Sequence, residues 1–408
     1  MTNPSTPSEP TRPPGPAVDE VPAAPSAAVV SAQTPPSRNP FTNIRTWYAK
    51  QPNWIKWIVR LACVAAAFAL PYLNSVPGIG TQIATQGTDW NTALFHISYY
   101  VLLALGLNVV VGYAGLLDLG YAGFFAVGTY SVALLTSPDS SVVTHKWTWL
   151  AAVPVAIGLA MLSGLILGWP TLRLRGDYLA IVTLGFAEII RIFADSLPVL
   201  RGDRGFGGIP HPPGHHSDGR PIFGVIDAKP YYYLGLSLVI LAIIAISNLD
   251  RSRVGRSWLA IREDEEAAEI MGVRTVKYKL WAFTIGAFFA GLAGALFAGE
   301  NGFVNSSTFV LQLSILILAG VVMGGAGNIP GAILGGALIS YIPDRLTGLH
   351  MPFTGTPGNP QGTDLAEYKF ILFGLVIILV MIFRPQGLIP SRRRAMELAD
   401  REKEVAPQ

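Results

Sequence analysis

The sequence predicts an all-α membrane protein with about ten transmembrane helices, some of them broken or re-entrant. Of its 408 residues, 51% are hydrophobic and only 13% are charged, whereas about a quarter of the residues in a typical soluble domain are charged. The chain also contains repeated apolar runs of about 18 or more residues, a length that crosses a bilayer as a helix. A transmembrane β-barrel would need short alternating strands instead, so these continuous runs favour helices.

Ten apolar runs qualify as candidate spans, with boundaries uncertain by about 2–4 residues. They cover residues 55–73, 94–114, 117–137, 148–169, 178–198, 231–249, 279–299, 308–325, 328–345 and 368–384. The predicted transmembrane domain therefore covers residues 51–390 and includes a polar loop at 250–278. A charged tail follows at 391–408.

Residues 1–50 form a tail rich in Pro, Ser, Thr and Ala. This tail has little apolar surface to bury, so we expect it to be disordered. The first apolar run begins near Ile55, too far along the chain for an ordinary signal peptide.

The distribution of basic residues predicts that both termini lie in the cytoplasm, because Lys and Arg in short loops favour that side. Of the 29 Lys and Arg residues, 20 lie in the N-terminal tail, the 170–177 turn, the 250–279 loop and the C-terminal tail. Seven lie in or beside the other loops, and Arg60 and Arg191 lie within spans. The even number of spans agrees with both tails being on one side.

Small residues recur at three- and four-residue spacing in the stretches 285–299 and 324–338. In lipid this spacing lets helix backbones approach closely. Glycine also permits broken helices, which are tolerated where the freed backbone faces protein or water. The two stretches therefore predict either tight packing or segments that move or line a cavity, as in transporters.

A Gly-x-Ala-Gly pattern occurs twice, at 112–115 and at 324–327. An inverted repeat would place the two turns on opposite sides of the membrane, but the predicted topology places both in the cytoplasm. The repetition is therefore either chance or a sign that one span is miscounted or re-entrant.

The most charged stretch is IREDEEAAEIMG, at residues 261–272. We predict one helix over 257–271, which Gly272 would end as a C′ residue. Residues three or four apart lie on the same face of a helix. One face would carry an apolar stripe of Ala260, Ala267, Ala268 and Met271, and another face would carry Glu263, Glu266 and Glu269.

A short helix of this kind needs a partner surface, because an isolated one is marginal in water. A solvated cytoplasmic loop would explain its basic residues but not its acidic ones, which contribute little to topology. A helix lying on the bilayer would be repelled by anionic head groups. Docking to a cytoplasmic protein is the interpretation we favour.

Two further features place charge near or inside the spans. Asp118 lies in a Gly-rich break between two spans, where it is either a functional carboxylate at membrane depth or an N-cap of the next helix. Glu188 and Arg191 lie three residues apart within one span and can pair on one helix face. We interpret them as a structural pair in the translocation domain rather than a direct substrate contact.

The sequence offers little sign of other chemistry. The single cysteine, Cys63, forms no intrachain disulfide, and we see no grouping of catalytic residues. We disfavour a metal site at His211, His215 and His216, because they lie in a flexible Pro/Gly loop without nearby cysteines. His96 is interpreted as an interfacial residue.

The acidic stretch resembles the EAA loop of ABC-importer permeases, in which Glu-Ala-Ala is followed by a glycine. Further stretches resemble the branched-chain amino acid permease family, and within it the M-type subunits. These stretches are residues 106–130, 172–192, 252–298, 324–338 and 383–389. The resemblance covers about residues 95–390 and excludes the Pro-rich tail and the loop at 210–224.

The resemblance implies that the acidic helix docks into an ATP-binding subunit and passes its motion to the spans. The implied ATPase-coupling residues are Glu263, Glu265, Glu266, Ala267, Ala268 and Gly272. The implied partners are a second homologous permease subunit, two cytoplasmic ATP-binding subunits and an extracytoplasmic substrate-binding protein. ATP and Mg would bind to the partner ATPases, because this sequence has no P-loop motif; we therefore expect no enzymatic activity, cofactor or metal in this chain.

The expected function is import of Leu, Ile and Val across a bacterial inner membrane by alternating access. Candidate residues of the translocation path are Asp118, Gly115, Glu188, Arg191, Gly324 and Gly325. One alternative is the import of urea or short amides on the same scaffold. A second is an ion-coupled secondary transporter, although the acidic residues expected of a proton relay are missing. The broken, Gly-rich spans disfavour a non-transporting scaffold.

Overall fold

The computed structural model describes residues 53–75, 89–171, 176–214, 221–224, 228–346, 368–383 and 387–389. Most of these residues are helical, and the β-structure found among them is a single bridge between Phe206 and Val304. The prediction of an all-α fold is confirmed. The predicted tails at 1–50 and 391–408, together with His215 and His216, lie outside the described residues.

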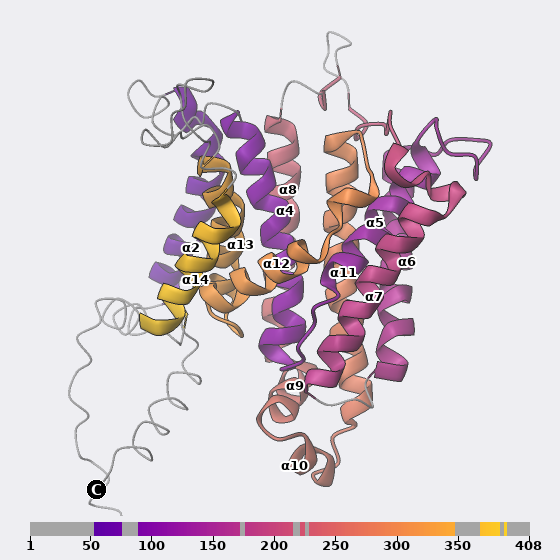
Figure 1. Ribbon diagram of the computed structural model, residues 1–408. Coiled ribbons are helices and arrows are strands. Elements are labelled where there is room, and N and C mark those ends of the chain that lie inside the picture. Colours follow the sequence, from indigo (N-terminus) through magenta and orange to yellow (C-terminus); the bar gives the residue numbers. More distant parts are fainter. Residues whose placement is uncertain are drawn as a thin grey trace, which may run out of the picture. The chain divides into compact units, whose positions relative to one another are not determined.

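Each of the ten predicted spans coincides with a helix (Figure 1). These helices are α2 (Asn53–Ala69), α4 (Trp90–Leu107), α5 (Tyr121–Thr136), α6 (Trp149–Thr171), α7 (Asp177–Ser196), α8 (Lys229–Arg251), α11 (Thr275–Asn301), α12 (Leu311–Gly324), α13 (Ile329–Leu346) and α14 (Lys369–Phe383). Five helical segments are long and apolar enough to cross a membrane by length and composition alone. They are Trp90–Tyr113, Trp149–Thr171, Lys229–Arg251, Thr275–Asn301 and Ser306–Gly324. The chain is a multi-pass membrane protein.

The chain divides into a small unit, residues 1–64, and a large unit, residues 65–408. Within the small unit the structure describes residues 53–64, the first part of α2, where apolar side chains such as Trp54 are exposed. The architecture and sites described below belong to the large unit.

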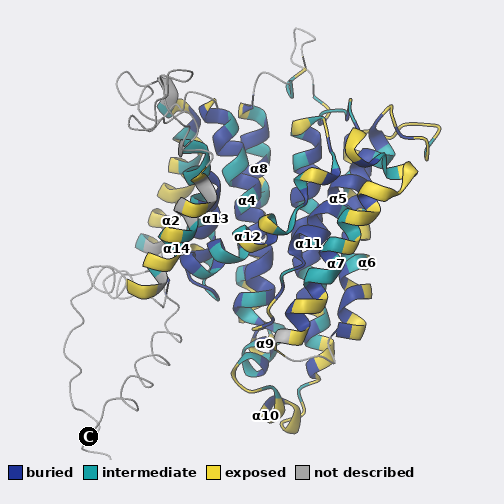
Figure 2. Ribbon diagram, viewed as in Figure 1, coloured by how far each residue is buried: buried dark blue, intermediate teal, exposed yellow. Residues whose placement is uncertain are grey.

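Helices α4 and α11 form the centre of the large unit. Helix α11 packs against α4, α5 and α6, and α4 also packs against α8 and α13. In the most apolar 18-residue stretch of each segment, 78% of the residues are buried in Trp90–Tyr113, which contains α4, and 61% in α11. The corresponding share is 28% in both α6 and α8. Figure 2 shows the same contrast in colour. Helices α6 and α8 therefore present much of their surface outward, as helices at the rim of a membrane bundle do.

Glycines on α11 allow helix backbones to touch, as the small-residue spacing predicts. A Cβ atom on Gly294 would lie 2.7 Å from the carbonyl oxygen of Phe125 on α5. Likewise, a Cβ atom on Gly128 of α5 would lie 2.6 Å from the Cα of Gly291. Side chains larger than hydrogen at these positions would force the helices apart.

Two of the spans contain or adjoin irregular backbone, although the segments Trp90–Tyr113 and Ser306–Gly324 are each long enough to cross a membrane. Helix α4 continues into a π-helix, Asn108–Tyr113, and the chain then runs through a non-helical segment before α5 begins at Tyr121. Helix α12 has 14 residues, which is about 21 Å at 1.5 Å per residue, shorter than the ~30 Å hydrocarbon core. It follows a short 3₁₀ helix, Ser306–Thr308. Irregular backbone is therefore present inside this bundle.

Two small helices lie at one end of the bundle, which we call the α10 end (Figure 1). They are α9 (Arg253–Glu263) and α10 (Glu265–Ile270), between α8 and α11 in the sequence. At the other end of α11, the bridge joins the loop at Phe206 to Val304 through two backbone hydrogen bonds of 2.8 and 2.9 Å.

Candidate functional site

The predicted helix over 257–271 is wrong as a single helix, because the chain breaks at Asp264. This residue has an extended backbone (φ −156°, ψ 112°), and its side chain caps α10. The Oδ1 atom of Asp264 accepts hydrogen bonds from the backbone amides of Glu266 and Ala267, at 2.9 and 3.0 Å. Aspartate is a favoured N-cap because it satisfies free amides in the first turn. Two helices result, and the Ala260 stripe does not continue onto α10.

Gly272 ends α10 as predicted. Its φ of +85° is a left-handed conformation that suits glycine. Its amide donates to the carbonyl of Glu269 at 2.9 Å, and the amide of Val273 donates to that of Ala268 at 3.0 Å. This pair of bonds is a Schellman motif. The chain then turns into α11, which begins at Thr275.

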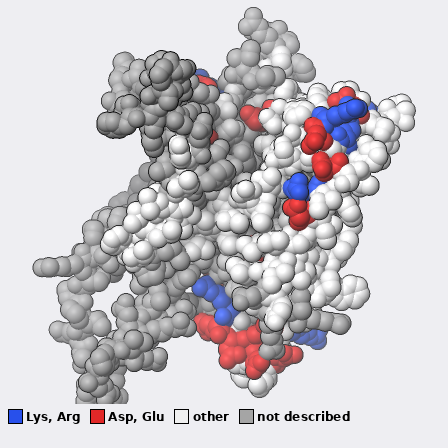
Figure 3. All heavy atoms as spheres, in the orientation of Figure 1, with Lys and Arg blue, Asp and Glu red and all other residues white. Residues whose placement is uncertain are grey.

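The outer surface of α10 is acidic with an apolar tip. Glu266, Ala267 and Glu269 are exposed, and Ile270 and Met271 are 85% and 83% exposed. Ala268, in contrast, is buried. Figure 3 shows the acidic side chains gathered at the α10 end. The surface offered to a partner therefore combines carboxylates with two apolar side chains, instead of the alanine stripe that we predicted.

Glu265 points inward rather than toward a partner. Its carboxylate forms an ion pair with the ammonium of Lys279 at 2.5 Å, and the two side chains are 27% and 3% exposed respectively. Lys279 lies in the first turns of α11. The ion pair therefore ties the start of α10 to the start of α11.

Helix α9 is anchored to the bundle by its apolar face. Trp258 and Ile261 are buried, and the indole of Trp258 donates a hydrogen bond to the carbonyl of Tyr278 at 2.7 Å. Ser252 caps the start of α9 by accepting from the amides of Val254 and Gly255. Since α9 is fixed, α10 projects from a rigid base.

The two Gly-x-Ala-Gly turns lie against each other. The side chain of Asn108 is fully buried and accepts a hydrogen bond from the amide of Gly327 at 2.8 Å. A Cβ atom on Gly112 would lie 2.4 Å from the nitrogen of Gly327. The turns are therefore at the same end of the bundle, as the predicted topology requires and as an inverted repeat would not allow.

The C-terminal segment closes this junction. The amides of Leu388 and Ile389 donate to the carbonyls of Met323 and Gly324 at 2.8 and 3.0 Å. A Cβ atom on Gly387 would lie 2.8 Å from the Cα of Gly325. The candidate path residues Gly324 and Gly325 thus lie where α12, α13 and the C-terminal segment meet.

Asp118 is fully buried in the connection between α4 and α5. Its Oδ1 accepts from the amide of Gly120 at 2.8 Å, one residue before α5 begins. The amide of Leu119, the residue before Gly120, donates to the hydroxyl oxygen of Thr183 on α7 at 3.0 Å. The Oδ2 atom has no hydrogen-bond partner among the described residues. Asp118 lies two residues before the N-cap residue Gly120, and no side chain caps α5. The predicted N-cap role is therefore wrong, and the carboxylate instead stabilises the turn that leads into α5.

Glu188 and Arg191 form the predicted pair near the middle of α7. The Nε atom of Arg191 donates to both carboxylate oxygens of Glu188, at 3.1 and 3.0 Å. The side chains are 41% and 31% exposed respectively. The pair therefore lies on a surface of this chain rather than in its core.

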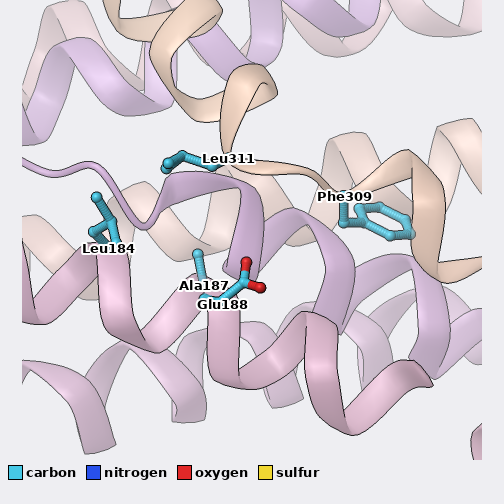
Figure 4. Close-up of a pocket in the computed structure, with 5 residues that line it drawn as sticks. All are labelled: Leu184, Ala187, Glu188, Phe309 and Leu311. Carbon is cyan, nitrogen blue, oxygen red and sulfur yellow. The ribbon is translucent and has the colours of Figure 1, made fainter. Parts of the chain in front are cut away.

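A small open pocket lies beside Glu188 (Figure 4). Its walls are apolar apart from the Glu188 carboxylate, and they come from α7 and from the residues around the start of α12. The lining residues are Leu184, Ala187, Glu188, Phe309 and Leu311. Binding pockets for small molecules combine apolar walls with a few polar groups in this way.

The histidines that the structure describes near the far end of α11 make local contacts. His211 contacts the carbonyl of Gly299 at 2.8 Å and the hydroxyl of Tyr231 at 2.6 Å. His96 lies 3.6 Å from a carboxylate oxygen of Asp344. No grouping of three metal-ligating side chains occurs within the described ranges.

Sequence reasoning missed three side chains that hold the α10 end together. Lys279 and Arg262 were counted among the basic residues of the 250–279 loop, and Asn108 was not considered. Arg262 and Asn108 contact residues 150 and 219 positions away, and Lys279 pairs with Glu265 across the turn between α10 and α11, so helical spacing carries no signal for these contacts. The signal that could have drawn attention to Asn108 is its polar amide side chain within an apolar run of the sequence.

Comparison with known proteins identifies the family of this chain. The model of the family described as "Branched-chain amino acid transport system / permease component" matches residues 91–381. The high-affinity branched-chain amino acid transport system permease proteins LivM of Salmonella typhimurium and Escherichia coli are each 40% identical over 317 residues, covering 73% of this chain and 69% of the relative.

A more distant relative is the corresponding permease protein BraD of Pseudomonas aeruginosa, which is 27% identical over 301 residues, 72% of this chain and 92% of the relative. No solved structure matches. The family match covers most of the chain, and the strongest identities extend over most of both proteins. This chain therefore belongs to the family of permease components of branched-chain amino acid transport systems.

Proposed function

We propose that this chain is one transmembrane subunit of an ABC importer that moves leucine, isoleucine and valine into a bacterial cell. It would pair with a second homologous permease, two cytoplasmic ATP-binding subunits and an extracytoplasmic binding protein. The α10 end would then face the cytoplasm. Kinship with LivM proteins supports this proposal.

The observation that carries the coupling role is the contrast between α10 and its supports. Its outer residues are exposed, while α9 and α11, on either side of it, are fixed by Trp258 and by the Glu265–Lys279 pair. A surface helix on a rigid base can receive a force and pass it on. Glu263, Glu266 and Ala267 would contact the ATPase, whereas Glu265, Ala268 and Gly272 would hold the shape of α10.

The translocation path would run along the outward face of α7. An ionised pair inside a membrane span normally faces a bundle interior or a water-filled cavity, yet Glu188 and Arg191 are partly exposed in this chain. The second permease subunit would cover them in the assembly. The apolar pocket walls suit a branched aliphatic side chain, and the Glu188 carboxylate is the polar group that would face the ammonium of an amino acid.

Glu266→Lys tests the coupling role in the complete importer. We expect the variant to insert normally but to lose ATP-driven leucine uptake, because a basic residue replaces a carboxylate in the contact. The matched control is Asp250→Lys, which makes the same charge change at an exposed position on α8. Normal uptake by Glu266→Lys would refute the role of α10.

Cross-linking locates the partner directly. Cys63 is the single cysteine, so Cys63→Ser combined with Ala267→Cys gives one reactive thiol on α10. We expect it to cross-link to an ATP-binding subunit in the assembled importer. If the new thiol reacted only with lipid-soluble or water-soluble reagents and formed no cross-link to a protein, the result would contradict the proposal. ATPase stimulation by urea in place of leucine would indicate the alternative substrate class.

A further inference from the structure

Arg262 links the α9–α10 region to both Gly-x-Ala-Gly turns. It lies in the last turn of α9, two residues before the break at Asp264. Its guanidinium donates a hydrogen bond to the carbonyl oxygen of Gly112, a residue 150 positions earlier in the chain. The last carbonyls of a helix lack partners within it. Arg262, from α9, supplies a donor to one of these carbonyls at the end of the π-helix Asn108–Tyr113 that extends α4.

The arginine side chain also fits between the two turns. A Cβ atom on Gly115 would lie 2.8 Å from its Cγ, and a Cβ atom on Gly327 would lie 2.8 Å from its Nη1. Both glycines have positive φ, +71° and +81°. Only hydrogen side chains therefore leave room for Arg262 at this place.

The turns that Arg262 contacts are themselves joined. Asn108 binds the amide of Gly327, and the backbone of Gly112 lies against the same residue. One turn ends the α4 extension and leads toward α5, while the other joins α12 to α13. A displacement of the Arg262 guanidinium would therefore reach two spans at once.

We propose that Arg262 is the positioning residue that passes the movement of α10 to these two turns. The inference rests on the proposed function, since it assumes that an ATP-binding subunit moves α10. It assigns the route by which that movement enters the spans. Helix α9 provides the rigid connection, because Asp264 alone separates it from α10 and Trp258 holds it to α11.

The planar guanidinium suits this task better than an ammonium would. Its donors are fixed in a fork, so Nη1 can be held in one position, donating to the Gly112 carbonyl and lying beside Gly327. Lysine keeps the charge but offers only a point contact. A graded response to Lys and Gln is therefore expected if geometry matters as well as charge.

The test uses Arg262→Gln and Arg262→Lys in the full importer, with uptake and ATP hydrolysis measured on the same proteoliposomes. We expect Arg262→Gln to assemble and hydrolyse ATP but to transport roughly tenfold less leucine per ATP, within the usual range of coupling energies. Arg262→Lys should recover part of this loss. The control is Arg256→Gln, an exposed arginine on the same helix.

A spin label at Leu117 separates coupling from simple stability. Leu117 is 38% exposed and lies two residues after Gly115. With Arg262 unchanged, the spectrum of the spin label should change when nucleotide is trapped on the importer. Arg262→Gln should abolish that spectral change without lowering the melting temperature. An equal loss of assembly and transport would show a purely structural role and overturn the inference, as would normal coupling.

Gly327→Ala gives a second, independent variant, because its Cβ would collide with the Arg262 side chain. Gly176→Ala is the matched control, since Gly176 also has positive φ (+56°) but no atom of the described residues within 4 Å of the added Cβ. We expect uncoupling only from Gly327→Ala, and equal effects of the two would contradict the inference. If even the unmodified importer fails to transport with ATP, the proposed function itself fails, which is a separate outcome.

Discussion

Two carboxylate–cation pairs, Glu265–Lys279 and Glu188–Arg191, combine similar charges in opposite surroundings. The first is at the α10 end, where Lys279 lies at the start of α11, and its lysine side chain is 3% exposed. The second is in the middle of α7, within a span, yet its side chains are 41% and 31% exposed. In each region the burial is the reverse of what a membrane protein standing alone would be expected to show.

The difference indicates which region is complete within this chain and which is not. A buried cation beside a carboxylate at the α10 end is already satisfied, so that region is rigid without a partner. Charges at membrane depth are costly when they face lipid, so the α7 surface needs a further covering. The contrast supports a fixed coupling end and a path face that is completed on assembly.

Breaking the Glu265–Lys279 pair should have the largest effect. Lys279→Met leaves the Glu265 carboxylate, 27% exposed, without its partner, and leaving a partly buried polar group unsatisfied destabilises a protein by about 1–3 kcal/mol. We therefore expect a marked fall in the melting temperature of the purified complex and loss of uptake. Thermal unfolding in detergent, followed by uptake in proteoliposomes, measures both.

The control for this prediction is Glu265→Leu combined with Lys279→Met. Replacing both partners with apolar residues is often nearly neutral, so the double variant should regain most of the lost stability. If it regains stability but not uptake, Glu265 also contributes to contact with an ATP-binding subunit. If it remains as unstable as Lys279→Met, the ion pair is not what joins α10 to α11.

Removing the Glu188–Arg191 pair should affect transport more than stability. Glu188→Leu combined with Arg191→Leu leaves no unpaired charge in the span, so insertion should be normal. Uptake should fall about tenfold, equivalent to roughly 1.4 kcal/mol of barrier height, because the path loses its polar group. Surface expression and leucine uptake are the two measurements.

The single variant Arg191→Leu sharpens this comparison, because it leaves the Glu188 carboxylate alone at membrane depth. We expect it to reduce the amount of inserted protein below that of the double variant. Normal transport by the double variant would mean that the pair only neutralises itself at the lipid boundary. That outcome would remove α7 from the path.

The sequence predicted features that depend on local pattern. Each of the ten runs located by hydropathy coincides with a helix, and the i, i+3 spacing of Glu188 and Arg191 predicted their contact. It also predicted the end of α10 at Gly272, because a glycine after a helical run commonly adopts the left-handed conformation. These features involve residues that are neighbours in the chain.

The missed features depend on contacts between distant segments or on competition between local preferences. Arg262 meets Gly112 across 150 residues, and no periodicity encodes that meeting. The break at Asp264 arises because a capping aspartate competes with helix continuation in a run of good helix formers. Lys279 was counted among the basic residues of the 250–279 loop, and only the fold places Glu265 beside it.

The smallest expected effect distinguishes the face of α7 from a surface that meets only lipid. Gly185 on α7 and Gly158 on α6 both have open space within 4 Å of an added Cβ. Replacing a helical glycine with alanine stabilises by about 0.5–1 kcal/mol where nothing clashes. Both Gly185→Ala and Gly158→Ala should therefore raise the melting temperature of the isolated chain slightly.

In the assembled importer the two variants should differ. A methyl group on Gly158 faces outward from α6, so uptake should be unchanged. A methyl group on Gly185 lies beside Leu184, a wall of the pocket, and should lower uptake measurably if the second permease packs against that face. Equal uptake by the two variants would place α7 against lipid, and the exposed Glu188–Arg191 pair would then have to be stable there without a protein covering.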